Sequence, residues 1–406
     1  MKSSGEDAYL KKNFSLVLTE LGISALGSSV FTVAILWVTV SSTRSAFMTG
    51  VVSAFLVIPL LFNFLVGSLV DGSEKKNMYA TVSFLLRGIS SLMLIPVELL
   101  HNSFLSIGLL IFSAIIYGFT MDFLVSIRAI WIQNFVKKVQ YLKGNSIYGI
   151  VSRATRLVGY SLSAVLLVIS IEGTVVFMAI MFFASGIVVL FVDKPNVSVQ
   201  KGVNFVKRTK EGFAYVMKSD ILKEIIVISM ISALFAGMTD TASSVMINLQ
   251  FHLTSSYLSF AFVSVTAGGL LSQFVASRID NIRMVGSKLT LLYLLGGLSF
   301  SIVGYFPNVY ILLTVYFVSG FLLGFASPII STVFLGNTDK IQMGRTQGLM
   351  DTMGTSFNSV SGVMAGAIMS ITAPRYIFFV MASGLIVLSI LTYLFKRIRL
   401  ETISAH

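Results

Sequence analysis

Long apolar runs separated by short polar loops dominate the chain. Twelve of them come close to the roughly 20 residues that a helix needs to cross the hydrocarbon core of a bilayer. The runs are continuous, without the ten-residue alternation of membrane strands, so they predict helices. We therefore expect an all-α polytopic membrane protein with twelve transmembrane helices. The predicted spans are residues 14–40, 47–69, 78–98, 104–130, 145–170, 174–193, 220–247, 255–278, 286–306, 309–335, 344–370 and 375–395.

Composition excludes a soluble globular protein. Of the 406 residues, 55% are hydrophobic and only 11% are charged, whereas soluble chains carry about 25% charged residues. The chain has no cysteine, which excludes structural disulfides, thiolate metal sites and cysteine nucleophiles. The first thirteen residues are polar and lack the cleavage pattern of a signal peptide, so we expect a cytoplasmic tail followed by a permanent span.

The positive charge of the chain follows the predicted membrane topology. The net charge is +12, yet the predicted outer loops hold only Arg44 and Arg375 of the 29 Lys and Arg residues. Basic residues concentrate on the cytoplasmic side of membrane proteins. We therefore expect both termini in the cytoplasm of a cell whose plasma or inner membrane the chain spans, and no role in nucleic-acid binding.

A basic segment divides the chain into two halves. Lysines interleaved with aromatic residues mark residues 194–218, a pattern that favours an amphipathic helix lying on anionic lipid. The predicted domains are an N-terminal six-helix bundle at 1–193, this linker, and a C-terminal six-helix bundle at 219–406. The sequence Ile-Ser-Ala-Leu occurs in the first span of both halves, at 23–26 and 231–234. Such internal repeats place a transporter's binding site at the interface of two pseudo-symmetric bundles.

A polar loop between the second and third spans predicts a gate. Gly67 permits close helix approach, Asp71 could cap a neighbouring helix, and Lys75 and Lys76 hold the loop inside. A weaker copy of this pattern, a small residue followed four positions later by an acid, ends at Asp280 after the eighth span. Polar residues also occur in the eleventh span. The predicted gate residues are Gly67, Asp71, Lys75, Lys76, Asp280, Arg283, Arg345 and Asp351.

Charged residues inside spans are the candidate site, because each costs about 2.5–3.5 kcal/mol on insertion scales and needs a partner or water. Asp122 lies 18 residues before Gln140 and Arg156 lies 16 residues after it. At about 1.5 Å per residue, their depths differ by about 3 Å across a helical hairpin. We predict an Asp122–Arg156 pair that binds a cationic substrate or a proton, with Arg153 one turn nearer the cytoplasm. The alternative is a structural ion pair.

Other polar and small residues have weaker roles in this interpretation. Asp240 is a second acid for coupling or a solvated residue at the mouth of the site, and Glu20 is a coupling acid or a partner at a helix end. Small residues on the fifth and eleventh spans allow close helix packing. The predicted packing residues are Gly159, Ser163, Gly362 and Gly366.

Signatures of enzymes are absent from the sequence. No phosphate-binding glycine loop with a lysine occurs, no group of His, Asp and Glu has metal-ligand spacing, and no Ser–His–Asp set fits a common face. We expect no catalysis, no cofactor and no metal.

Taken together, the chain resembles the major facilitator superfamily. The resemblance rests on twelve spans, the basic central linker and Gly67-x-Leu-x-Asp71 with Lys75-Lys76. The macrolide-efflux-like branch of drug and siderophore exporters fits best, on the segments that begin at Lys143, Glu211 and Gly344. The resemblance implies that the first, fourth, seventh and tenth helices line a central cavity, so that Asp122 would face substrate.

Three departures from the family pattern weaken proton-coupled drug export: Gly72 replaces the usual Arg, Ala114 stands where an Arg is common, and Tyr160 follows Gly159 in place of Pro. The expected function is a monomeric secondary transporter that exports amphiphilic drug-like compounds or metabolites, with proton exchange as the candidate energy source. The alternatives are a carrier for metabolite uptake or facilitated diffusion, and a transport-inactive receptor or scaffold.

Overall fold

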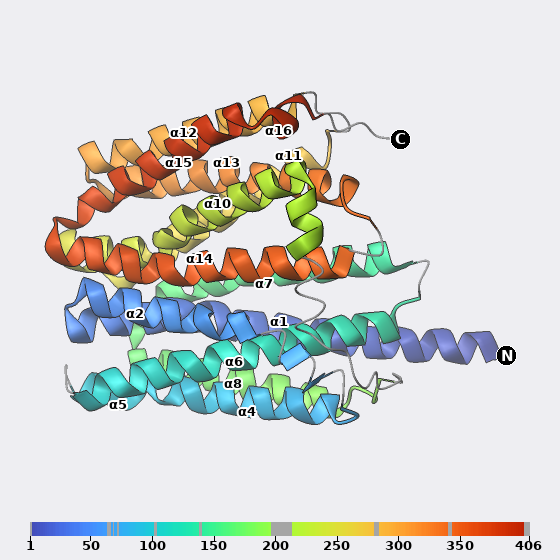
Figure 1. Cartoon of the computed structure of the whole chain (residues 1–406). Helices are drawn as coiled ribbons and strands as arrows, with labels where there is room; N and C mark the ends of the chain where they lie inside the picture. Colours follow the sequence, from blue (N-terminus) through green and yellow to red (C-terminus); the bar gives the residue numbers. More distant parts are fainter. Residues whose placement is uncertain are drawn as a thin grey trace. The chain divides into compact units, whose positions relative to one another are not determined.

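The described part of the chain is helical and contains no strand, which confirms the predicted all-α fold. The computed structural model describes residues 2–62, 66–67, 69–70, 73–100, 104–137, 140–195, 213–279, 284–339 and 343–401. Two compact units divide it: residues 1–43 with 55–203, and residues 44–54 with 204–406. Each unit is a bundle of helices (Figure 1).

The first unit holds the helices of the N-terminal half. The start of α2 is grouped with the second unit and its last residues with the first. In chain order the elements are α1 (Lys2–Thr43), α2 (Ala46–Val57), η1 (Ile58–Phe62), α4 (Lys76–Leu92), α5 (Leu94–Leu100), α6 (Phe104–Phe135), α7 (Tyr141–Ile169) and α8 (Ile171–Leu190).

The second unit holds the C-terminal helices and begins, after the linker, with a span that ends in a π-helical turn, η3. In chain order the elements are α10 (Asp220–Val245), η3 (Met246–Gln250), α11 (Ser255–Ala276), α12 (Val285–Tyr305), α13 (Val309–Gly336), α14 (Met343–Ile371), η4 (Pro374–Tyr376), α15 (Ile377–Leu394) and α16 (Lys396–Leu400).

Corresponding helices of the two units have corresponding neighbours. In the first unit α1 packs against α7 and α8, and α4 packs against α6 and α8. In the second, α10 packs against α14 and α15, and α12 packs against α13 and α15. When the spans are numbered from one to six within each half, both units therefore have the same contacts. The first span packs against the fifth and sixth, and the third span packs against the fourth and sixth. This repeat is what a duplicated six-helix bundle requires, as the sequence repeats predicted.

Each unit has an aromatic cluster in its core. Phe31 of α1 stacks on Tyr117 of α6 with ring centroids 4.3 Å apart, and Phe182 of α8 meets both rings edge-on. In the second unit Phe300 of α12 meets Tyr316 of α13 edge-on, at 6.3 Å. Aromatic pairs at these distances add about 0.5–1.5 kcal/mol beyond the area they bury.

Ten helices of the described part are long and apolar enough to cross a membrane. The second and eleventh predicted spans are not among these ten, each for a physical reason. The second was predicted as one helix over 47–69, but α2 ends at Val57 and a 3₁₀ turn follows, because Pro59 lacks the N–H that continues an α-helix. The eleventh, α14, is 29 residues long, but its sequence includes Arg345, Gln347 and Asp351, and it is not apolar enough to be counted among the ten.

Two further boundaries differ from the expectation. The third span, predicted as continuous over 78–98, changes at Met93 from α4 to α5. The predicted linker at 194–218 lies largely outside the described residues, although its last part, 213–218, is helical.

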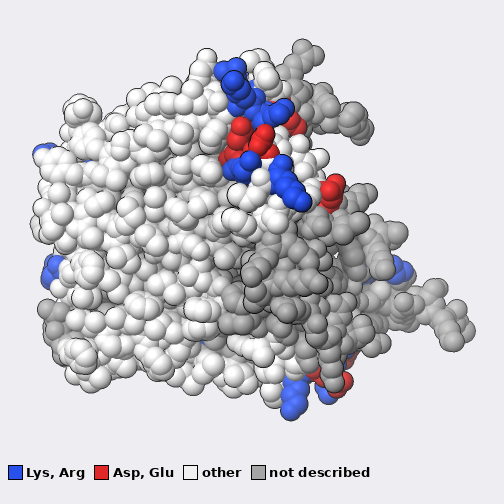
Figure 2. Space-filling model, in the orientation of Figure 1, with Lys and Arg blue, Asp and Glu red and all other residues white. Residues whose placement is uncertain are grey.

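Charged side chains of the second unit gather where α16 lies beside the beginning of α10 (Figure 2). Lys223 forms an ion pair with Asp220 at 2.8 Å, and Glu224 accepts hydrogen bonds from the backbone N–H groups of Arg397 and Ile398. By contrast, the α15 surface exposes apolar residues such as Val387 and Ile390. Apolar sides with charged ends suit helices that span a bilayer.

The first testable prediction concerns the close contact between α11 and α13. A Cβ at Gly320 would lie 2.3 Å from the carbonyl oxygen of Val265, whereas a Cβ at Gly336, on the same helix, meets nothing within 4 Å. We expect Gly320→Ala to separate the helices and lower the free energy of unfolding by about 1–3 kcal/mol. Thermal unfolding of the purified protein checks this, with Gly336→Ala as the control. Equal unfolding temperatures for the two variants would contradict the packing argument.

Candidate functional site

An ion pair buried inside the first unit joins α1 to α6. Glu20 is completely buried, and Arg128 donates to it twice, from Nη2 to Oε1 at 2.5 Å and from Nε to Oε2 at 3.2 Å. Arg128 Nη2 also donates to Ser24 Oγ at 2.6 Å. Tyr148 of α7 interacts with the same guanidinium. Two-pronged pairs of this kind are the strong, directional form of the ion pair, so three helices are held at one point.

A second arginine, Arg87 of α4, is 1% exposed. Its Nε donates to Thr120 Oγ1 at 3.0 Å, its Nη1 to Ser28 Oγ at 3.2 Å and its Nη2 to Met121 Sδ at 3.1 Å. The guanidinium carbon lies 4.5 Å from the centre of the Tyr117 ring, a cation–π distance. Among the described residues Arg87 forms no ion pair with a carboxylate. Its charge is therefore held by hydroxyls, a thioether and an aromatic face.

Asp122 of α6 is completely buried, and neither carboxylate oxygen has a hydrogen-bond partner among the described residues. Gly118 and Ser126, one turn to either side, share its helix face. A Cβ at Gly118 would lie 2.6 Å from Pro59 Cγ, and Ser126 Oγ lies 3.9 Å from the Cβ position of Gly67. Asp122 therefore faces the second span. The expectation that Asp122 faces a central cavity stays a prediction.

The predicted pair between Asp122 and Arg156 is wrong. Asp122 has no hydrogen-bond partner among the residues that the structure describes, and Arg153 and Arg156 are both exposed on α7. Positions along the two helices give the two groups similar depths but carry no information about rotation around the helix axes. Because α6 turns Asp122 toward the second span, the two side chains do not meet.

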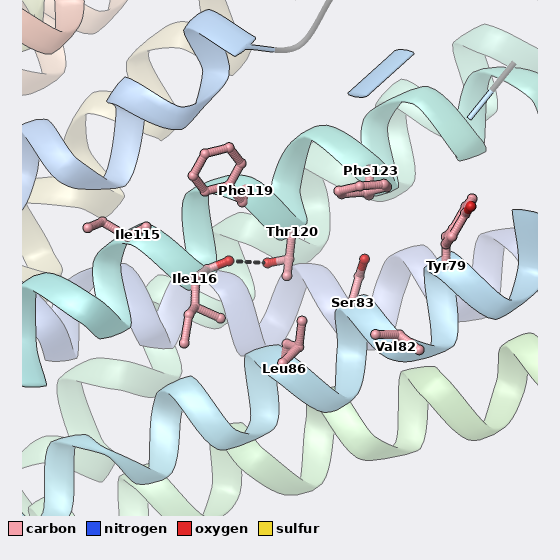
Figure 3. Close-up of a pocket in the computed structure, with 9 residues that line it drawn as sticks. All are labelled: Tyr79, Val82, Ser83, Leu86, Ile115, Ile116, Phe119, Thr120 and Phe123. Carbon is pink, nitrogen blue, oxygen red and sulfur yellow. Dashed lines mark hydrogen bonds between the residues drawn. The ribbon is translucent and has the colours of Figure 1, made fainter. Parts of the chain in front are cut away.

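An apolar crevice of about 300 Å³ lies between α4 and α6 (Figure 3). Its walls are mainly aromatic and aliphatic, with three hydroxyl groups from Tyr79, Ser83 and Thr120. The Thr120 hydroxyl donates to the Ile116 carbonyl oxygen and accepts from Arg87 on its other side. The lining residues are Tyr79, Val82, Ser83, Leu86, Ile115, Ile116, Phe119, Thr120 and Phe123.

Other predicted site residues are dispersed over the molecule. Asp240 is half-buried on α10. Asp351 is exposed on α14 and accepts a hydrogen bond from Gln347 Nε2 at 2.8 Å. Lys76 begins α4, is 2% exposed, and donates to the Ser73 carbonyl oxygen, while Lys75 is exposed. The predictions at Asp71, Asp280 and Arg283 lie outside the described residues, as does the side chain of Arg345.

The small residues singled out for packing lie at close helix contacts. A Cβ at Gly159 of α7 would lie 2.7 Å from Ser29 Cβ of α1. Ser163, one turn further, is completely buried. In the second unit, a Cβ at Gly366 of α14 would lie 2.6 Å from the Ala46 carbonyl oxygen, and Gly362 lies one turn away against Gly50.

Sequence reasoning did not include Arg87 and Arg128 among the site residues. A signal for them is present in α1, where Glu20, Ser24 and Ser28 recur every four residues and so form a polar stripe on one helix face. A buried stripe of this kind needs donors from neighbouring helices. The two arginines supply those donors.

The Glu20–Arg128 pair gives the second testable prediction. Glu20→Gln should lower the free energy of unfolding by about 3–5 kcal/mol, because it leaves the Arg128 charge buried without a counterion. The double variant Glu20→Leu with Arg128→Met removes both charges at similar volume and should recover most of that loss. Thermal unfolding of the three proteins measures both effects. A double variant no more stable than the single one would show that the pair's geometry, and not the stranded charge, decides stability.

Comparison with known proteins gives matches that cover both halves of the chain. The family model of the Major Facilitator Superfamily matches residues 21–238 and again residues 225–404. No curated protein sequence matches the chain.

Solved structures of several transporters have a similar fold. The nucleoside transporter NupG is 14% identical, covering 95% of this chain and 99% of that one, with a TM-score of 0.72. The human organic anion transporter MFSD10 is 14% identical, with coverage of 94% and 99% and a TM-score of 0.63. A bacterial homolog of the human lysosomal transporter Spinster, inward-facing and unoccupied, is 12% identical, with coverage of 97% and 98% and a TM-score of 0.68.

At these identities the structures establish a common fold. Because the family model matches each half of the chain, and the halves form two helical bundles with corresponding neighbours, the chain belongs to the Major Facilitator Superfamily.

Proposed function

We propose that this chain is a secondary active transporter that exports amphiphilic drug-like compounds or metabolites by alternating access, with Asp122 as the proton-carrying group. The superfamily membership and the resemblance to transporter structures support transport as the general function. The short motifs that begin at Lys143, Glu211 and Gly344 favour the macrolide-efflux-like branch and hence export.

The burial of Asp122 carries the proposal. The described residues offer an ionised carboxylate at this position no hydrogen bond to compensate for its lost hydration, and that loss is costly inside a membrane protein. Protonation removes the charge and with it most of the cost. A group that is stable when protonated in one conformation and ionised in another is what proton-coupled transport needs.

A break in the second span provides a route for Asp122 to reach water. The segment of the second span around Pro59, where the helix changes to a 3₁₀ turn, packs against the face of α6 that carries Asp122. Breaks of this kind act as hinges because a few residues absorb the backbone change. In the proposed cycle, movement of this segment away from α6 exposes Asp122, which releases its proton, and return of the segment requires protonation.

The charged side chains on the helices around Asp122 are either bonded to other groups or exposed away from it. Glu20 and Arg128 are paired with each other, and Arg87 is bonded to Thr120, Ser28 and Met121. Arg153 and Arg156 are exposed on α7. In the described structure Asp122 therefore lacks a fixed counterion, so its protonation can respond to the movement of the second span.

Topology and organisation complete the proposal. The positive-inside asymmetry favours a cell membrane with both termini in the cytoplasm and a basic linker at 194–218 on anionic lipid. The proposed units are an N-terminal bundle at 1–193 and a C-terminal bundle at 219–406, acting as a monomer. The loop at 67–76 would hold the inner gate.

Two other functions are compatible with the fold, and specific residues of the sequence favour the first. A carrier for metabolite uptake or facilitated diffusion needs no proton, and the three departures at Gly72, Ala114 and Tyr160 favour it. A transport-inactive receptor would keep the fold and bind ligand without flux. Flux measurements in vesicles separate both from proton-coupled export.

Replacement of Asp122 gives the third testable prediction. In proteoliposomes loaded with a panel of labelled amphiphiles, we expect flux that rises at least tenfold when a pH gradient is imposed. Asp122→Asn should remove this stimulation while leaving substrate binding within about threefold, because the amide keeps the volume but binds no proton. Asp339→Asn, at an exposed loop position, is the matched control and should transport normally.

The other outcomes distinguish the alternatives. Flux that is insensitive to the pH gradient in the unmodified protein favours facilitated diffusion or uptake, and binding without any flux favours a receptor. Full pH-dependent transport by Asp122→Asn would eliminate Asp122 as the proton carrier.

A further inference from the structure

The crevice between α4 and α6 has the composition of a small-molecule site. Its volume, about 300 Å³, is at the lower end of the range for ligand pockets, about 300–1,000 Å³. Tyr79, Phe119 and Phe123 supply aromatic walls, and the hydroxyls of Tyr79, Ser83 and Thr120 are the polar groups of the lining (Figure 3). An apolar chain or a single ring is therefore the kind of group that the crevice accommodates.

The crevice is continuous with the lipid-facing surface of the first unit. Val82 and Leu86 of α4 line it while remaining 43% and 39% exposed, and Phe119 of α6 is 38% exposed. Both helices are membrane-spanning by length and apolarity. A hydrophobic ligand dissolved in the bilayer could thus enter from the side without crossing water.

A positive charge that has no anionic partner in the described part of the chain lies directly behind the crevice. Thr120 Oγ1, which lines the crevice, accepts the hydrogen bond from Arg87 Nε at 3.0 Å. Ser83, also in the lining, is one turn before Arg87 on α4. Among the described residues Arg87 has neutral acceptors, and the neighbouring Glu20–Arg128 pair is balanced. Arg87, Glu20 and Arg128 together carry one excess positive charge, and the buried acid Asp122 lies on another face of α6.

We propose that this crevice is a binding site for an anionic amphiphile, a medium-length alkyl or aryl carboxylate. The apolar tail occupies the space between α4 and α6, and the carboxylate approaches Arg87 by displacing or sharing the Thr120 hydroxyl. A charged hydrogen bond between guanidinium and carboxylate is about twice as strong as a neutral one. The ligand thereby supplies the anion that the described protein groups do not.

The depth of Arg87 favours a free amphiphile over a phospholipid. Arg87 is eleven residues from the beginning of α4 at Lys76, which corresponds to about 16 Å along the helix. This is about half of the 30 Å hydrocarbon thickness. A phospholipid headgroup held at the membrane surface does not reach this depth, whereas a single-chain carboxylate can move inward. Cationic amphiphiles are excluded by charge.

The site is distinct from Asp122, and the proposal does not depend on transport. Arg87 contacts α6 through Thr120 and Met121, while Asp122 lies on the face of α6 that carries Gly118 and Ser126. Binding can therefore be measured without flux, and failure of either proposal leaves the other standing.

Photolabelling of the purified full-length protein tests the site. The protein is placed in phosphatidylcholine nanodiscs and exposed to decanoate bearing a diazirine on its chain, with the matching diazirine decanol as the neutral probe. We expect the carboxylate to label residues 79–86 and 115–123, with at least tenfold less labelling by the alcohol at equal concentration. Mass spectrometry of the digested protein locates the labels.

Two variants and a matched control test the geometry. Ser83→Phe fills the crevice and should reduce labelling at least fivefold, whereas Leu85→Phe, on the same helix but 45% exposed and outside the lining, should leave it unchanged. Arg87→Gln should remove the preference for carboxylate over alcohol, and Arg87→Lys should retain part of it. Because Arg87→Gln removes contacts from α4 to α1 and α6, its folding is checked by thermal unfolding.

The comparison of probes on the unmodified protein does not depend on any variant. Equal labelling by alcohol and carboxylate would overturn the role of Arg87, and equal labelling of Ser83→Phe and Leu85→Phe would overturn the location. Loss of labelling when phosphatidylglycerol replaces half of the phosphatidylcholine would identify a bilayer lipid as the occupant and overturn the proposal of a free carboxylate.

Discussion

The ion pair between Glu20 and Arg128 is the interaction around which the first bundle is arranged. A charge inside a membrane protein must find a partner or water, and this pair satisfies the requirement completely, with Ser24 as a further acceptor. It fixes α1 against α6, and Arg87 then ties α4 to the same two helices. The packing of α1, α4 and α6 therefore depends on these three buried charged side chains and their hydrogen bonds.

The buried charged groups of this bundle differ in how well they are satisfied, and the difference separates structure from function. Glu20 and Arg128 satisfy each other, Arg87 has neutral acceptors and an aromatic face, and Asp122 has no partner in the described structure. A fully satisfied pair resists change, because separating it exposes two desolvated charges. The incompletely satisfied groups are those that a proton or a ligand can stabilise, which is why the two proposals rest on Asp122 and Arg87.

The two halves share a scaffold but not a chemistry. Equivalent helices have equivalent neighbours, yet the buried ion pair belongs to the first unit. In the second unit, Tyr316 of α13 contacts α10 through neutral groups: its hydroxyl accepts a hydrogen bond from Ser243 Oγ and donates one to the Thr239 carbonyl oxygen. Duplication thus supplies the architecture, and divergence of a few side chains concentrates charge in one bundle. Function is set by such side chains and not by the fold itself.

The sequence by itself determined the number, type and approximate limits of the helices, and their division into two repeated halves. The length of each hydrophobic run can be compared directly with the thickness of the bilayer, and the distribution of Lys and Arg predicts the orientation of the helices. It also identified Asp122 as a buried acid. The partners of the buried charges were decided only by tertiary structure, because partner choice depends on rotation about each helix axis as well as on depth. Asp122 therefore faces the second span instead of Arg156, and the break at Pro59, the Arg87 contacts and the crevice became visible only once the helices were packed.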